Sequence, residues 1–294
     1  MQGLLLINKP AGRTSFSVVS AVKKAASQKR VGHTGTLDPM ATGVLPVLLG
    51  RATVLSSIML DADKRYIARV KLGITTDTDD ITGEVISQKE VNISKEALSL
   101  ALEHFTGEIE QIPPMYSAIK KDGVRLYKLA REGKTAEIDP RKVNIFEIKL
   151  LSDLNQENEF VIDVHVSKGT YIRSLARDIG EYLGCGATLT ALERTYACGF
   201  DIKDCVALED LCSDNIEGYL LNEEIAVGHL REINVSEKQA VRFCNGGQLM
   251  FERLKVTDFN DGELFRIKYN EKLLGIGFAD CKKEQIGIKC ILNL

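Results

Sequence analysis

The sequence has little of what marks membrane and secreted proteins. No apolar run approaches the roughly 20 residues that a membrane-spanning helix needs. The first ten residues, MQGLLLINKP, are too few for a signal peptide and lack its basic lead, so we interpret residues 3–8 as a buried strand. We therefore expect a cytoplasmic protein that does not enter a membrane.

Motifs for cofactors and metals are also missing. There is no G-x-x-x-x-G-K-[ST] for a nucleotide triphosphate and no G-x-S-x-G for acyl transfer. The four histidines form no metal-spaced pair, and the seven cysteines form no C-x-x-C pair, which indicates reduced thiols. The acidic stretch from residue 77 lacks the glycine and the closing glutamate of a calcium loop. We expect no metal and no cofactor, which leaves reactions that a carboxylate drives.

The net charge of −3 does not by itself indicate a nucleic-acid-binding protein. Residues 201–224, however, hold eight acids and one lysine, a local charge of −7 that leaves +4 for the rest of the chain. A mildly basic body is compatible with RNA binding through a local patch. A solvated acidic face explains the same segment equally well.

Apolar periodicity and capping residues predict a chain of alternating strands and helices. Thr14 or Ser15 caps a helix that runs to about residue 29, Ser94 begins a helix that runs to about residue 105, and Thr170 caps a helix that runs to about residue 183. Further strands are predicted at about 43–49, 65–72, 142–150, 159–167 and 188–197, and after residue 230 a short helix at 236–243 precedes strands at about 263–269, 272–278 and 286–292.

Residues 31–39, VGHTGTLDP, form a polar stretch with two glycines just before the apolar run of residues 44–49. Glycine lets a loop approach a ligand closely, and Pro39 biases Asp38 away from helical geometry. The pattern predicts an acid held on a structured loop before a strand, although an ordinary surface turn explains this stretch alone.

Residues 116–134 are rich in basic and aromatic side chains. Such interleaving suits contacts to phosphates and bases, although a solvated amphipathic helix has the same composition. We interpret about 114–140 as an RNA-binding excursion from the core.

Five stretches in order resemble the tRNA pseudouridine(55) synthase family (TruB). Residues 32–46, GHTGTLDPMATGVLP, are similar to the signature of that family. The other four stretches are NKPAGRTS at 8–15, DKRY at 63–66, IPPMYSA at 112–118 and GTYIRS at 169–174. The last part of the chain, with Asn245 and Gly246 after a short helix, resembles a PUA domain.

The resemblance implies both a fold and a reaction. The fold is α+β: a catalytic domain at 1–229, built on a mixed, mainly antiparallel sheet flanked by helices, and a small PUA-like β-barrel at 230–294 that binds RNA. The reaction is the isomerisation of a uridine in the T loop of tRNA, position 55, to pseudouridine. It changes no oxidation state, in agreement with the missing cofactor motifs.

The resemblance also assigns catalytic roles to three residues. Asp38 matches the catalytic aspartate, which either attacks as a nucleophile or stabilises charge while the glycosidic bond breaks. Arg173 matches the arginine that pairs with it and favours the charged carboxylate. Tyr66 matches the tyrosine that stacks on the target uracil.

Further residues match positions that contact the substrate. His33 matches the residue that fills the space left by the flipped base, and Tyr171 and Leu192 match residues that line the uracil pocket. Lys9 and Lys64 suit either structural support or a phosphate contact. The family usually has two basic residues after the leucine, whereas this chain has Glu193 and then Arg194, so one backbone contact is in doubt.

Three hypotheses follow for the whole protein. The first is a stand-alone synthase that acts on tRNA as a monomer, without guide RNA. The second is a catalytic subunit that works with guide RNA. Relatives of that kind carry extra basic terminal segments, whereas this chain starts at its first strand and ends with the small barrel, so we favour the first hypothesis. The third is an RNA-binding or RNA-folding protein without catalysis, which would not need Asp38, Tyr66 and Arg173 together.

Overall fold

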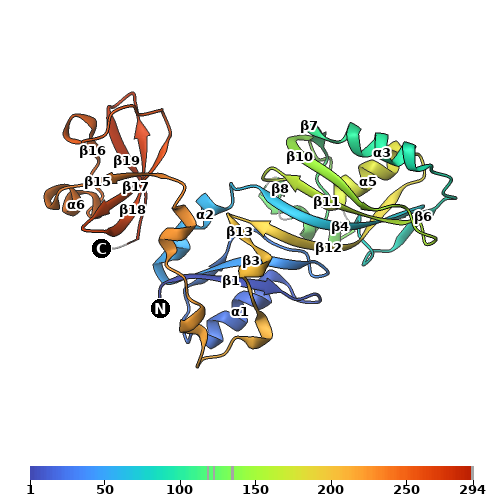
Figure 1. The fold of residues 1–294 in the computed structure, drawn as a ribbon, viewed down its shortest axis with the longest axis horizontal. Coiled ribbons are helices and arrows are strands. Elements are labelled where there is room, and N and C mark those ends of the chain that lie inside the picture. Colours follow the sequence, from blue (N-terminus) through green and yellow to red (C-terminus); the bar gives the residue numbers. More distant parts are fainter. Residues whose placement is uncertain (118, 122, 134–135, 293–294) are drawn as a thin grey trace.

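The computed structural model describes residues 1–117, 119–121, 123–133 and 136–292. Figure 1 shows one long, curved sheet with helices packed against it and a smaller C-terminal sheet beside one end. The strands of the long sheet are β1 (Gly3–Lys9), β2 (Val31–His33), β3 (Thr42–Leu49), β4 (Lys64–Leu72), β7 (Gly107–Gln111), β10 (Arg141–Ser152), β11 (Glu159–Val166), β12 (Ala187–Ala197), β13 (Phe200–Asp201) and β14 (Val206–Ala207).

The main path through this sheet runs β14-β1-β3-β12-β4-β11-β10-β7. Two neighbouring pairs, β1 with β14 and β3 with β12, are parallel, and all others on the path are antiparallel. The predicted mixed, mainly antiparallel sheet is therefore confirmed.

The two halves of the sheet meet where β12 lies beside the start of β3, with Glu193 opposite Thr42 and Arg194 opposite Gly43. A Cβ at Gly43 would lie 2.2 Å from the Arg194 carbonyl oxygen, and its φ is +106°, so this close approach requires glycine. The junction places the loop before β3 next to Leu192.

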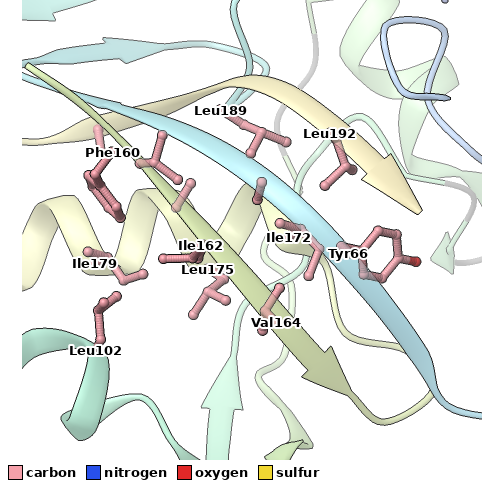
Figure 2. Close-up of a cluster of buried hydrophobic side chains, with 14 of the residues drawn as sticks. Tyr66, Leu102, Phe160, Ile162, Val164, Ile172, Leu175, Ile179, Leu189 and Leu192 are labelled. Atoms are coloured by element: carbon pink, nitrogen blue, oxygen red, sulfur yellow. The ribbon is translucent and has the colours of Figure 1, made fainter. Parts of the chain in front are cut away.

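Helices cover the sheet on both sides of this junction. Two of them, α3 (Lys95–His104) and α5 (Ile172–Tyr182), cover the half formed by β4, β11 and β12, and Figure 2 shows the apolar cluster that these helices form with the strands. Another, α1 (Ser15–Ala25), packs on β1 and β3 in a second cluster. The remaining short elements are η1 (Gly50–Leu55), α2 (Ser56–Met59), the strands β5 (Ile74–Thr76), β6 (Val85–Gln88), β8 (Lys120–Lys121) and β9 (Val124–Arg125), the helix α4 (Leu126–Arg131), and the 3₁₀ turns η2 (Ile202–Asp204), η3 (Leu208–Asp210), η4 (Ile216–Tyr219) and η5 (Glu223–Val227).

The C-terminal unit is a curled sheet of five strands in the order β15-β17-β18-β19-β16, consistent with a PUA-like domain. Its elements are β15 (Arg231–Asn234), α6 (Glu237–Cys244), β16 (Leu249–Met250), η6 (Phe251–Arg253), β17 (Leu264–Tyr269), β18 (Lys272–Asp280) and β19 (Gln285–Ile291). Leu273, Ile276 and Leu292 of this unit share a buried cluster with Leu4 and Leu55 of the long-sheet part. The two parts therefore pack through a common apolar core.

Some predicted boundaries were wrong. The first helix ends at Ala25 rather than near residue 29, because Ser27 adopts φ +48° and the amides of Ser27 and Gln28 bond back to the carbonyls of Lys24 and Lys23. The predicted strands also omit β5, which forms a hairpin with β6.

The basic stretch is also not one helix. It forms the short hairpin β8–β9 and then α4, and Lys134 lies outside the described residues.

Candidate active site

Asp38 lies on the loop between β2 and β3, which is bonded to the neighbouring elements on both sides. The Ser15 hydroxyl accepts a hydrogen bond from the Leu37 amide at 2.9 Å and donates one to the Leu37 carbonyl at 3.2 Å. The amide of Gly12 donates to the Pro39 carbonyl at 2.8 Å. The loop with Asp38 is therefore held against the start of α1 and the turn after β1, and it lies directly before β3, as the sequence pattern predicts.

The guanidinium of Arg173 binds the Asp38 carboxylate at both oxygens. Its Nε lies 2.9 Å from Oδ2, and its Nη2 donates to Oδ1 at 3.1 Å. The Arg173 side chain is 5% exposed, and that of Asp38 is 30% exposed. A bidentate pair with a buried guanidinium fixes the orientation of the carboxylate and favours its ionised form.

The remaining donors of Arg173 point to two other segments. Nη1 donates to the Thr78 carbonyl at 3.0 Å and lies 3.7 Å from an Asp80 carboxylate oxygen, and Nη2 also donates to the Tyr116 carbonyl at 2.9 Å. Asp80 is itself held by the Thr82 amide and hydroxyl. All three guanidinium nitrogens therefore have partners, and Arg173 has one well-defined position.

Burial raises the pKa of Asp38 above the usual range of a carboxyl, and the Arg173 guanidinium opposes that rise. Asp80 adds to the rise, and Lys9 opposes it. Burial and neighbouring charges together therefore set the protonation state of Asp38, which is typical of reactive carboxylates.

Tyr66 and Leu192 lie together at one end of the apolar cluster under α5. They are 8% and 7% exposed, on the neighbouring strands β4 and β12, and Leu37 belongs to the same cluster. Figure 2 shows Leu192 near Tyr66, whose hydroxyl is turned away from the cluster. Leu37, the residue before Asp38, thus lies in the same apolar group as Tyr66 and Leu192, the two residues predicted to contact the uracil.

Tyr171 immediately precedes α5, and its backbone is held by a side chain that sequence reasoning missed. The Gln111 amide oxygen accepts from the Tyr171 N–H at 2.8 Å, and the Gln111 Nε2 donates to the Tyr171 carbonyl at 3.1 Å. The predicted cap, Thr170, is wrong, because its hydroxyl bonds to the Ser167 carbonyl and Tyr171 is the N-cap residue. Burial raises the pKa of the Tyr171 phenol.

Arg194 is a second side chain that the sequence left without a role. It is 1% exposed, and its Nε donates to the Val44 carbonyl at 2.7 Å while its Nη2 donates to the Gly35 carbonyl at 3.2 Å. The signal in the sequence was the family pattern of two basic residues after the leucine, of which this chain keeps Arg194. His33 lies nearby on β2, half-buried; burial lowers the pKa of its imidazole, and the Arg194 charge lowers it further.

The two lysines bind backbone carbonyls. Lys9 is fully buried, and its Nζ donates to the carbonyls of Pro10, Arg13 and Pro39. Lys64 is 8% exposed and donates to the carbonyls of Leu60 and Ala62. Burial lowers the pKa of Lys9 to about 8 and also lowers that of Lys64. Of the two alternatives that the sequence left open, the geometry favours structural support over phosphate contact.

The described part of the chain offers no cluster of three or more His, Cys, Asp or Glu side chains suited to a metal ion. Among the helices of that part, none is long and apolar enough to cross a membrane.

Solved structures with a similar fold include a Cbf5-Nop10-Gar1 complex, which covers 99% of this chain and 84% of the other with a TM-score of 0.78 and 26% identity. An archaeal box H/ACA sRNP Nop10-Cbf5 complex has a TM-score of 0.74 at 24% identity, covers 99% of this chain and 86% of the other, and supports the fold alone.

Sequence relatives are more similar. A tRNA pseudouridine synthase B of Clostridium perfringens (strain 13 / Type A) is 41% identical over 284 residues, 96% of each chain. The same-named protein of Microcystis aeruginosa is 45% identical over 282 residues, 94% of each chain. Residues 23–172 match the family model described as TruB family pseudouridylate synthase (N terminal domain), and residues 173–232 match the tRNA pseudouridylate synthase B C-terminal domain. The chain therefore belongs to the TruB family of pseudouridylate synthases.

Proposed function

We infer that this protein is a tRNA pseudouridine synthase that converts a uridine in the T loop of tRNA, position 55, to pseudouridine. The observation that carries this inference is the bidentate pair between Asp38 and Arg173 beside the apolar group of Tyr66 and Leu192. A carboxylate held against a pocket for a planar base is what such an isomerisation needs. Family membership supports the substrate, since the relatives are named for tRNA.

The reaction moves one bond and one proton. The bond between ribose C1′ and uracil N1 breaks, a bond between C1′ and uracil C5 forms, and the C5 proton is lost while N1 gains one. Asp38 is the catalytic carboxylate, acting as a nucleophile at ribose C1′ or at uracil C6. Arg173 keeps it ionised and aimed while the charge on the base changes.

The base must leave its folded loop before the reaction, which costs about a few kcal/mol of stacking. We propose that Tyr66 then stacks on the uracil, that Leu192 and Tyr171 line its pocket, and that His33 fills the space that the base leaves. Lys9 and Lys64 support the loops around the site rather than binding RNA, because their ammonium groups are already bound to carbonyls.

The proposed domains are a catalytic part at 1–229 and an RNA-binding, PUA-like part at 230–294. The start of β15 at residue 231 and the end of the family match at residue 232 support this boundary. We propose that the protein works without guide RNA, because relatives at 41–45% identity carry the name of tRNA enzymes. We also propose that it is a cytoplasmic monomer.

The test is pseudouridine formation in an unmodified tRNA transcript, mapped by position, with wild-type protein and the Asp38→Asn variant and no guide RNA. We expect product at the T-loop uridine from the wild type only, with tRNA binding unchanged in the variant. Bound tRNA without product from the wild type would contradict the proposal, and equal loss of binding in the variant would make Asp38 structural.

A further inference from the structure

Two arginines project from α5 one helical turn apart, at positions 173 and 177. Residues at i and i+4 lie on the same face of a helix, so both side chains point to the same side of α5. Arg173 carries the pair with Asp38, whereas the described contacts of Arg177 do not include that carboxylate.

Arg177 is bound to two segments that are distant in sequence. Its Nη1 lies 2.9 Å from the Asp79 carboxylate, and its Nη2 donates to the Ile112 carbonyl at 2.9 Å. Asp178 accepts from its Nε and Nη2 at 3.0 and 2.9 Å. The side chains of Arg177, Asp79 and Asp178 are 21%, 14% and 19% exposed, so these contacts are largely shielded from water.

The same two segments hold Arg173. Thr78 and Asp80, on either side of Asp79, contact Arg173, and the Tyr116 carbonyl lies four residues beyond Ile112. The Ser174 hydroxyl also donates to the Ile112 carbonyl, at 2.9 Å. Each arginine therefore bridges the loop at 78–80 and the segment at 112–116. Arg173 does so next to Asp38, and Arg177 does so one helical turn further along α5.

We propose that Arg177 is a positioning residue for the isomerisation: by tying Asp79 and Ile112 to α5, it keeps the carbonyls of Thr78 and Tyr116 on Arg173 and so keeps Arg173 on Asp38. This inference rests on the proposed function, because it concerns the carboxylate that the reaction uses. Small displacements of a reacting group cost large factors in rate, about a hundredfold for roughly 1 Å.

The charged groups around Arg177 support its role as a positioning residue. The groups that face Arg177 are Asp79, Asp178 and Glu181, while Arg173 also acts on Asp79. Burial raises the pKa of Asp79 to about 6, and the Arg177 charge opposes that rise. The pair of Asp79 with Arg177 therefore weakens as the pH falls below about 6.

The experiment compares Arg177→Gln and Arg177→Lys with the wild type in single-turnover pseudouridine formation on a tRNA transcript. We expect Arg177→Gln to lower the rate by at least tenfold with the Kd for tRNA within twofold of wild type, and Arg177→Lys to recover part of the rate. The acid limb of the pH profile should move to higher pH in Arg177→Gln, because a looser Arg173 stabilises the Asp38 carboxylate less. The charges facing Asp38 that stay unchanged are Asp80 and Lys9.

Two further variants separate positioning from general stability. Glu103→Gln alters an exposed residue of α3 that has no part in these contacts and should leave the rate and pH profile unchanged. In an Arg173→Lys background, Arg177→Gln should add little, because its effect passes through Arg173. If Arg177→Gln does not fold, Asp79→Asn removes the other partner of the same contact and should show the same rate loss and pH shift.

The outcomes are distinct. Three results would overturn the role of Arg177 while leaving the proposed function intact. The first is a folded variant with the rate and pH profile of the wild type, and the second is a rate loss matched by lost tRNA binding. The third is full additivity with Arg173→Lys. No pseudouridine from the wild type would overturn the proposed function itself.

Discussion

Gln111 binds the backbone of Tyr171 at both of its polar groups, across 60 positions of sequence. Gln111 is 1% exposed at the end of β7, and Tyr171 is the N-cap residue of α5. The side-chain amide of Gln111 thus binds the Tyr171 N–H in place of a local cap. It thereby fixes the start of the helix that carries Arg173. The start of α5 is therefore set by tertiary contact rather than by a local cap.

We expect Gln111→Glu to lower the free energy of unfolding by about 1–3 kcal/mol, because a carboxylate cannot donate to the Tyr171 carbonyl and is buried beside it. Urea denaturation measures the change. Gln88→Glu, the same substitution at an exposed position of β6, is the matched control and should be nearly neutral. Equal stability of the two variants would show that the amide contact contributes nothing.

Arg173→Lys should lower the single-turnover rate by roughly 10- to 100-fold, since charge-assisted hydrogen bonds contribute about 1.5–3 kcal/mol and an ammonium lacks the planar fork with which the guanidinium binds both oxygens of Asp38. Binding of tRNA measured by filter retention should stay within twofold. A variant that binds tRNA normally and reacts at the wild-type rate would remove Arg173 from the site.

The pH dependence should shift in Arg173→Met. In the proposed reaction Asp38 acts as a carboxylate, so activity should fall as the pH drops through its pKa, and burial already raises that pKa. The Arg173 charge opposes the rise, so its removal raises the pKa further and moves the acid limb of the rate profile to higher pH. An acid limb that stays in place, or moves down, contradicts this control of Asp38 by Arg173.

The pKa of the His33 imidazole should rise when Arg194 is replaced by Met. Burial and the Arg194 charge both lower the pKa of His33 in the folded protein, so loss of that charge raises it. The depressed value means that the folded state binds fewer protons than the unfolded state. The contribution of the neutral His33 imidazole to folding stability is therefore present above the pKa of about 6.5 in the unfolded state. It is lost as the pH falls through the lower pKa in the folded state. NMR titration of the His33 ring measures the shift, and an unchanged pKa would show that the Arg194 charge does not reach it.

Local structure was readable from the sequence wherever a local signal determines it. Thr14 and Ser94 cap α1 and α3 as predicted, since their hydroxyls accept from the amides of Ser17 and Ala97. The alternation of β4 places Lys64 and Tyr66 on the buried face, as a period of two requires. The loop with Asp38 was predicted from its glycines and Pro39, the pairing of Asp38 with Arg173 was predicted from the resemblance, and the geometry agrees with both.

The rest of the site depends on contacts that carry no local signal. Arg173 is held by the carbonyls of Thr78 and Tyr116, and a backbone carbonyl is the same in every residue. The parallel pairing of β12 with β3 joins segments about 150 positions apart through Arg194 and Gly43. The early end of α1 depends on a left-handed Ser27, a conformation that few residues other than glycine adopt.

Removal of residues 230–294 should weaken tRNA binding more than chemistry, and the structure adds a loss of stability. The deletion takes away Leu273, Ile276 and Leu292 and leaves Leu4 and Leu55 uncovered on the remaining part. Exposing buried apolar surface costs about 25 cal/mol per Å², so the truncated protein should unfold at a lower temperature than the full chain. Circular dichroism melting and single-turnover rates at saturating protein separate the two effects.

Glu224→Gln is the control for this truncation, because it loosens the junction without uncovering the core. The Glu224 carboxylate lies 2.7 Å from Arg266 Nη1 and 2.9 Å from Lys268 Nζ, both on β17. These partly exposed pairs contribute about 1 kcal/mol, so Glu224→Gln should lower the melting temperature slightly and leave the rate unchanged. If the truncated protein melts at the same temperature as the full chain, the shared apolar cluster does not stabilise the long-sheet part. A large fall in its rate at saturation would instead show that the C-terminal part takes part in the chemistry, because the RNA is already bound under that condition.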